Sequence, residues 1–195
     1  MGEPRWHGNG FTQFDLNARQ RLHVWHPDWG PNEGHNSTIH DHVFDLESEV
    51  LIGKVGHEVF DVDTNHHGDW NMHEVCDWKS GQRDYEGRLG REYLATVKRR
   101  SMGKQWLSEG SVYFFPHRVF HESSSQGLTA TLMTKGAVSH PDHKPRILCH
   151  QDAGDSTDAR APGHGPSLGM MWTIIEMALL NMPNHARQAV EACIS

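Results

Sequence analysis

Short runs of β-branched and aromatic residues, punctuated by glycine and proline, fill the first three quarters of this chain of 195 residues. Runs of this kind are typical of β-strands joined by turns, and no helical spacing separates them. The expected strands are residues 21–25, 38–44, 49–55, 58–62, 70–78, 92–98, 105–107, 112–115 and 128–134. This succession predicts an all-β fold, a closed antiparallel jelly-roll barrel.

The last quarter of the chain has a different character. Residues 150–167 are rich in Gly, Pro, Asp and Ser and contain no large apolar residue, which indicates a flexible linker or long loop. Apolar residues then recur at helical spacing, so we expect a helix over residues 168–181 and a second over 186–193. We therefore divide the chain into a barrel domain (1–149), the linker (150–167) and a C-terminal helical extension (168–195). The helices are expected to pack on the outside of the barrel, in preference to binding a partner or forming a dimer.

Charge and cysteine content exclude several classes of protein. The formal charge of −7, with histidine neutral, argues against a nucleic-acid-binding surface. The basic cluster at residues 98–100 is too short to change this and predicts an exposed strand end or a hairpin turn. The three cysteines are far apart and form no Cys-x-x-Cys motif, which favours a reduced, cytoplasmic chain. No apolar segment is long enough to cross a membrane, so no membrane association is expected.

Two histidines lie one residue apart in a predicted strand, His40 and His42. Residues i and i+2 of a strand point to the same face, so both rings can reach one point in space. A third ligand must come from another strand, and His121 follows the apolar run at residues 112–115. His117 has the same strand parity as His121, which leaves it as the alternative third ligand. Three imidazoles with open positions suit a catalytic site for Fe, Zn, Ni or Mn.

The segments around these histidines resemble the two metal-site motifs of the cupin superfamily. In the first motif, residues 34–53, the positions that match are Gly34, His40, His42 and Glu47, while Gly53 comes one residue early. In the second, residues 110–125, the positions that match are Gly110, Pro116 and His121, while Arg118 replaces a glycine and Ser125 an asparagine. The resemblance implies a cupin barrel in which His40, His42 and His121 bind a metal and Glu47 is a candidate fourth ligand.

One branch of the cupins, the three-histidine thiol dioxygenases, resembles this chain more specifically. The shared features are the His40-Asp41-His42 segment and a His-Arg-Val run at residues 117–119, whereas the strand after His121 lacks the tyrosine of that branch. The resemblance implies a non-haem Fe(II) dioxygenase that acts on a small molecule such as a thiol. His117 or Glu47 would then orient the substrate or move a proton.

Other assignments within the cupins stay open. With Zn, Ni or Mn in place of iron, the ion would act as the Lewis acid of an isomerase, a lyase or a decarboxylase. A non-catalytic cupin that binds a small ligand is a further alternative. Arg21 and Arg118 are candidates to bind a carboxylate of the substrate. The small-molecule substrate is the expected partner, and the family resemblance implies a homodimer.

Overall fold

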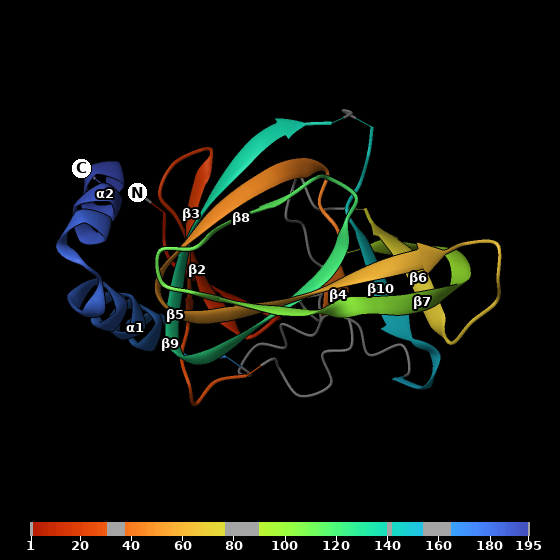
Figure 1. Cartoon of the computed structure of the whole chain (residues 1–195), viewed down its shortest axis with the longest axis horizontal. Helices are drawn as coiled ribbons and strands as arrows, with labels where there is room; N and C mark the ends of the chain where they lie inside the picture. The colour runs from red at the N-terminus through yellow and green to blue at the C-terminus, as the bar shows by residue number, and fades with distance from the viewer. Residues whose placement is uncertain (1, 31–37, 77–89, 140–141, 154–164, 195) are drawn as a thin grey trace.

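One antiparallel β-sheet closes on itself and carries two helices on its outer side (Figure 1). The computed structural model describes residues 2–30, 38–76, 90–139, 142–153 and 165–194. In this part of the chain, ten strands follow the spatial order β1-β2-β3-β9-β4-β10-β6-β7-β5-β8. Their bounds are β1 Arg5–His7, β2 Phe11–Asp15, β3 Gln20–Trp25, β4 Ile39–His40, β5 Phe44–Asp63, β6 Trp70–Val75, β7 Arg91–Ser108, β8 Val112–Phe115, β9 Phe120–Val138 and β10 Arg146–His150.

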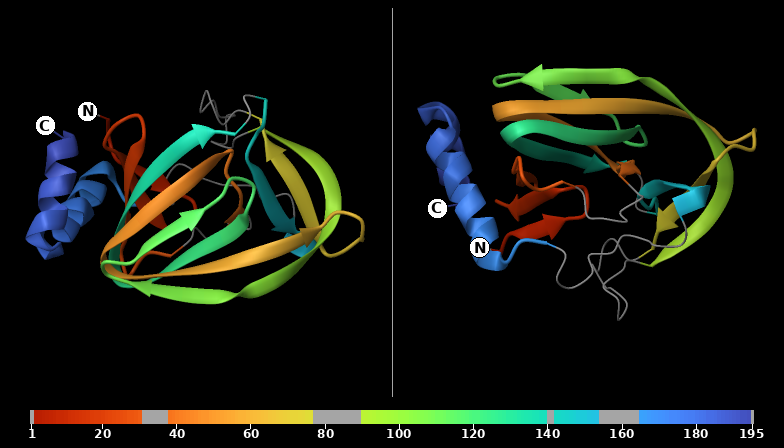
Figure 2. Two further views of the ribbon diagram at one scale, coloured as in Figure 1. Left: turned by 45° about the horizontal axis from the view of Figure 1, so that its top comes forward. Right: turned by 90° about the horizontal axis from the view of Figure 1, so that it is seen from below.

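Strand β9 closes the barrel. It pairs with β3 and β4 along the sheet and also with β5 from the far end, so the ring runs β9-β4-β10-β6-β7-β5 and returns to β9. All the pairings are antiparallel, and Figure 2 shows the closed ring from two further sides. The predicted fold class is confirmed: an antiparallel jelly-roll barrel with a short helical C-terminal region.

Three strands, β5, β7 and β9, are longer than the sequence predicted. The expected breaks at residues 45–48 and 56–57 are wrong, because β5 runs from Phe44 to Asp63, with a bulge between the partners of Ile52 and Lys54. Gly53 takes a φ of 76°, a conformation that glycine adopts without strain, so the strand bends without ending. The prediction that the basic cluster is a strand end or turn is also wrong. It lies inside β7, where Arg100 opposes Asp61 of β5 and forms an ion pair at 3.0 Å.

Three strands were not expected, namely β1, β2 and β10. Strand β2 is short, and its residues Phe11, Thr12, Gln13 and Phe14 are all buried, so it lacks the polar alternation of a half-exposed strand. Strand β10 pairs with both β4 and β6. Partners on both sides, which the sequence does not reveal, stabilise β2 and β10, while β1 is an edge strand that pairs with β2.

The C-terminal helices cover one outer face of the barrel. Helix α1 (Leu168–Asn181) begins after Ser167, whose side chain accepts a hydrogen bond from the backbone N–H of Met170. Helix α2 (Asn184–Ile194) follows Pro183. Both helices lie against the outer side of the barrel (Figure 2). Their apolar side chains form one core cluster with residues of β2, β3, β5 and β9. The expected packing of these helices on the barrel is confirmed, although most of the proposed linker lies outside the described residues.

The described helices are too short to cross a membrane: none provides a long enough apolar span.

Candidate metal centre

Three histidines converge inside the barrel, and they are the three that the motifs indicated. The potential ligand atoms of His40, His42 and His121 all lie within 4.8 Å of one another. Their ring centroids are 4.7 Å apart for His40 and His121, 4.9 Å for His40 and His42, and 5.2 Å for His42 and His121. Such spacing allows three imidazole nitrogens to bind one ion.

Strand pairing explains this convergence. His40 is the direct partner of His121 where β4 pairs with β9. His42 lies two residues beyond His40 and points to the same side, while the intervening Asp41 points the opposite way and is buried. One residue pair in register and one i, i+2 relationship therefore place all three rings.

Hydrogen bonds fix the orientation of two of the rings. Nδ1 of His40 lies 2.8 Å from the carbonyl oxygen of Thr38, and Nδ1 of His121 lies 3.0 Å from that of Val119. A carbonyl oxygen only accepts, so each Nδ1 carries the proton and donates it. With the proton on Nδ1, Nε2 is the unprotonated nitrogen of each ring. A bond from Nδ1–H to a backbone carbonyl is common in histidines that bind a metal through Nε2.

Two histidines of the cluster, His42 and His121, are held neutral. Burial lowers the pKa of His42 and of His121 well below the ordinary histidine value, and the neighbouring His40 lowers both further. Metal binding requires the unprotonated ring, so this environment favours metal over protons near neutral pH.

A small cavity of about 70 Å³ adjoins the cluster. Much of its wall comes from the N-terminal strands, which the sequence analysis did not connect with the site. The residues that these strands and the preceding turn contribute are His7, Asn9, Phe11, Gln13, Arg21, His23 and Trp25. Arg21 thus lies at the site as proposed, while burial lowers the pKa of His23 to about 3. The signal in the sequence was the parity of Arg21, His23 and Trp25, which share one face of β3.

His57 is a further cavity residue that the sequence analysis left as an ordinary histidine. Its Nδ1 lies 2.9 Å from Oγ of Ser123, and its ring centroid lies 4.2 Å from that of Tyr113. Its Nε2 is buried and has no hydrogen-bond partner among the described residues. Burial lowers its pKa to about 4, so His57 is a neutral base inside the cavity. Tyr113 and Phe115 line the same cavity.

Glu47 does not reach the histidine cluster. Leu46 and Ser48 face inward at 5% and 1% exposure, and strand alternation places Glu47 between them on the exposed side. The bulge at Gly53 lies beyond this segment and does not reverse its direction. The structure therefore places Glu47 away from a fourth ligand position.

His117 lies outside the cavity as well. Its side chain is 42% exposed, and both its backbone N–H and its Nδ1 lie 2.8 Å from Oδ1 of Asp45. Of the two alternatives for the third ligand, the structure brings His121 to the cluster. His117 bonds at the surface because the chain between it and His121 turns at Arg118, which has a φ of 67°.

The fold and the site together define a class: an antiparallel β-barrel protein with a cluster of three histidines, one buried and two half-buried, that can hold a metal ion. No family model and no curated protein matches this chain. Among solved structures, hydroquinone 1,2-dioxygenase from Sphingomonas sp. TTNP3 is similar at 13% identity and a TM-score of 0.30, covering 63% of each chain.

Two other solved structures show a similar level of resemblance. Oxalate decarboxylase from Bacillus subtilis has 10% identity and a TM-score of 0.35, covering 92% of this chain and 36% of that one. KdgF from Halomonas sp. has 14% identity and a TM-score of 0.29, covering 70% of this chain and 88% of that one. This chain spans less than two thirds of the dioxygenase and decarboxylase chains. Similarity at this level assigns no activity to it.

Proposed function

We propose that this chain is a metal-dependent enzyme, a non-haem Fe(II) dioxygenase that acts on a small molecule, with thiols as the first substrate class to test. The observation that carries the proposal is the convergence of His40, His42 and His121, two of which place Nδ1 against a backbone carbonyl oxygen. The three imidazoles would hold a ferrous ion, which would supply the redox chemistry that protein side chains lack.

The cavity indicates the size and charge of the substrate. Its volume of about 70 Å³ lies far below the several hundred cubic ångströms of ordinary ligand pockets, so a molecule of few atoms fits. Arg21 supplies a positive charge in the wall and also lies 2.9 Å from Asp15. We assign Arg21 to the binding of a substrate carboxylate, which would orient the rest of the molecule towards the histidines.

His57 is assigned to proton movement. Its Nε2 has no partner among the described residues, its ring is neutral, and its centroid lies 6.5 Å from that of His121. A neutral imidazole at this place can accept a proton from a bound substrate. Tyr113 packs against this ring and holds it in place.

The same His57 favours a second candidate function. In an isomerase or a lyase, Zn, Ni or Mn would polarise the substrate as a Lewis acid while a neutral base removes a proton. Oxygen dependence separates this class from a dioxygenase. Retention of a bound small molecule without turnover would indicate a non-catalytic binding protein.

Metal analysis tests the proposal first. Untagged protein is purified without oxygen in the presence of Fe(II) and compared with a His40→Ala/His121→Ala variant and with His67→Ala, which changes an exposed histidine of no assigned role. We expect about one equivalent of iron in the parent and in His67→Ala and almost none in the double variant. Oxygen uptake with small thiols and other small carboxylates then tests turnover. Equal metal content in all three proteins would contradict the proposed site.

A further inference from the structure

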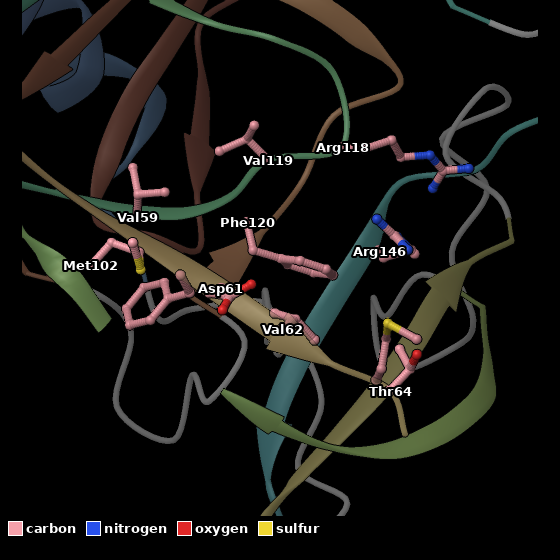
Figure 3. A pocket seen from close by; sticks show the side chains of 11 residues that line it. Val59, Asp61, Val62, Thr64, Met102, Arg118, Val119, Phe120 and Arg146 are labelled. Carbon is pink, nitrogen blue, oxygen red and sulfur yellow. The ribbon is translucent and has the colours of Figure 1, made fainter. Parts of the chain in front are cut away.

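A second cavity lies on the other side of the His40–His42 segment. Its volume is about 570 Å³, and none of its lining residues belongs to the histidine cavity. The second half of β5, the start of β9 and β10 contribute most of its wall (Figure 3). We call this cavity the arginine groove, because Arg118 and Arg146 lie together on one side of it, with Met102 on the opposite side.

The two arginines are held by one buried carboxylate. Oδ2 of Asp41 lies 2.6 Å from Nε of Arg146 and 3.7 Å from a terminal nitrogen of Arg118. Oδ1 of Asp41 accepts a hydrogen bond of 2.6 Å from the backbone N–H of Arg146. The side chain of Asp41 is fully buried, whereas those of the arginines are 23% and 24% exposed. Two guanidinium groups over one carboxylate leave a surplus positive charge that faces the groove.

No acidic group cancels this surplus within the described lining. Asp61 is the acidic residue there, and it already forms an ion pair with Arg100 at 3.0 Å. The terminal nitrogens of Arg146 have no hydrogen-bond partner among the described residues, and one of those of Arg118 donates to the carbonyl oxygen of Lys144 at 3.0 Å. Guanidinium donors therefore remain for an incoming anion.

Arg118 stands where the backbone favours glycine. Its φ of 67° makes it the one described non-glycine residue in the left-handed region, and its backbone N–H donates to the carbonyl oxygen of His42 at 2.9 Å. A non-glycine residue pays a conformational cost there, and such costs are concentrated at functional positions. Glycine would make the same backbone bond without that cost. The backbone conformation therefore does not explain why residue 118 is an arginine, so the explanation must lie in its side chain.

We propose that the arginine groove binds a small organic carboxylate with an aromatic or aliphatic body. The carboxylate pairs with Arg118 and Arg146, and the body lies against the apolar lining residues Phe60, Val62, Met72 and Phe120. The volume lies within the usual range for small-molecule sites. This site is separate from the histidine cavity and does not depend on the function proposed for that cavity.

Benzoate is the probe that tests the proposal, with benzamide as its neutral match. Metal-free full-length protein labelled with ¹³C in the methionine methyl groups is titrated with each compound and followed by NMR. Met72 lines the arginine groove and Met133 lines the histidine cavity, so their signals report the two places separately. We expect benzoate to shift the Met72 signal with a Kd on the order of 1 mM, and benzamide to shift it at least tenfold more weakly.

Two variants test the role of charge. Arg118→Gly suits the backbone and is expected to fold normally, yet to bind benzoate about tenfold more weakly. Thr64→Glu adds a negative charge to the groove lining and is expected to weaken binding similarly, whereas Asn65→Glu adds the same charge to the neighbouring residue outside the lining and should change it little.

Several results would overturn the proposal. They are a benzoate-dependent shift at Met133 without one at Met72, equal binding of benzamide, unchanged binding in Arg118→Gly, and no shift at tens of millimolar benzoate.

Discussion

His40 and His121 lie directly opposite each other where β4 pairs with β9, with their ring centroids 4.7 Å apart. The metal site therefore depends on strand register, because a slip of one residue would turn His121 to the other face. This relationship also distinguishes His121 from His117 as the third ligand.

Single substitutions test that distinction. We expect His121→Ala to lower Fe(II) affinity by at least tenfold, because one of three ligands is lost. His117→Ala and Glu47→Ala should keep the parent affinity, since both side chains lie outside the cluster. Anaerobic titration with Fe(II) measures all three. Loss of affinity in His117→Ala with retention in His121→Ala would reverse the assignment.

The ion pair between Asp41 and Arg146 predicts that removing Arg146 alone destabilises the protein more than replacing both residues. Arg146→Met removes the nearest charge from the buried Asp41 carboxylate and leaves it the backbone N–H of residue 146 and the more distant Arg118, so we expect a loss of about 3 kcal/mol in the free energy of unfolding. Adding Asp41→Asn removes the unpaired charge and should restore part of that loss. Urea denaturation of the single and double variants measures both. Additive losses would show that the two residues do not interact.

His57 predicts a dependence of stability on pH. Its folded pKa is about 4 against an ordinary value of 6.5, so between these values the unfolded chain binds a proton that the folded chain does not. Lowering the pH from 7 to 5 should therefore cost about 2 kcal/mol at this residue alone. Metal-free His57→Gln should lose correspondingly less stability over that interval than the metal-free parent. Urea denaturation at pH 7 and pH 5 measures the loss of stability in both proteins. An equal loss in the parent and in His57→Gln would contradict the buried neutral state of His57.

Gly53 and Gly103 form a matched pair of positive-φ glycines. A Cβ at Gly53 would lie 2.4 Å from the carbonyl oxygen of Leu128, whereas one at Gly103 would meet nothing within 4 Å. Gly103→Ala should cost about 1 kcal/mol for its backbone alone, and Gly53→Ala about 2 kcal/mol more because β9 must move. Thermal unfolding compares them. A similar loss of stability in both variants would show that β9 can move away from residue 53 at little cost in free energy.

The attachment of helix α1 can be tested at two of its residues. Ile175 is 2% exposed in the cluster with β2, β3 and β9, and Leu180 is 73% exposed. Ile175→Ala should lower the free energy of unfolding by about 3 kcal/mol, and Leu180→Ala by less than about 0.5 kcal/mol. Chemical denaturation of both variants provides the comparison. An equally mild effect at Ile175 would mean that the helix contributes little to the stability of the barrel.

Local patterns predicted the parts of the fold that depend on local chemistry. Helix α1 follows from the spacing of its apolar residues, and most strands of the barrel follow from their alternation. The extent of β5 did not, because its pairing with β9 and β7 joins segments that the sequence indicates as separate strands. Strands β1 and β2 were missed since their stability comes from neighbours distant in the chain.

The candidate site divides in the same way. The convergence of His40, His42 and His121 followed from strand parity and motif spacing. His23 and His57 could not be assigned to the cavity, because a histidine in a strand looks the same whether its face is buried or exposed. Their burial arises from the docking of β3 beside β9 and of His57 against Tyr113. The outward direction of Glu47 was one of two registers compatible with the sequence.

Strands β2 and β3 contact different parts of the protein on their two faces. Phe14, Leu22 and Val24 point outward into the cluster with the C-terminal helices, while the alternate residues Gln13 and His23 face the histidine cavity. The helices therefore pack against the outer side of the cavity wall, although no described residue of either helix lines the cavity. A substitution in α1 or α2 would therefore loosen the packing of β2 and β3 around the histidine cavity without displacing the three histidines. We expect such a substitution to change the rates at which small molecules enter and leave that cavity.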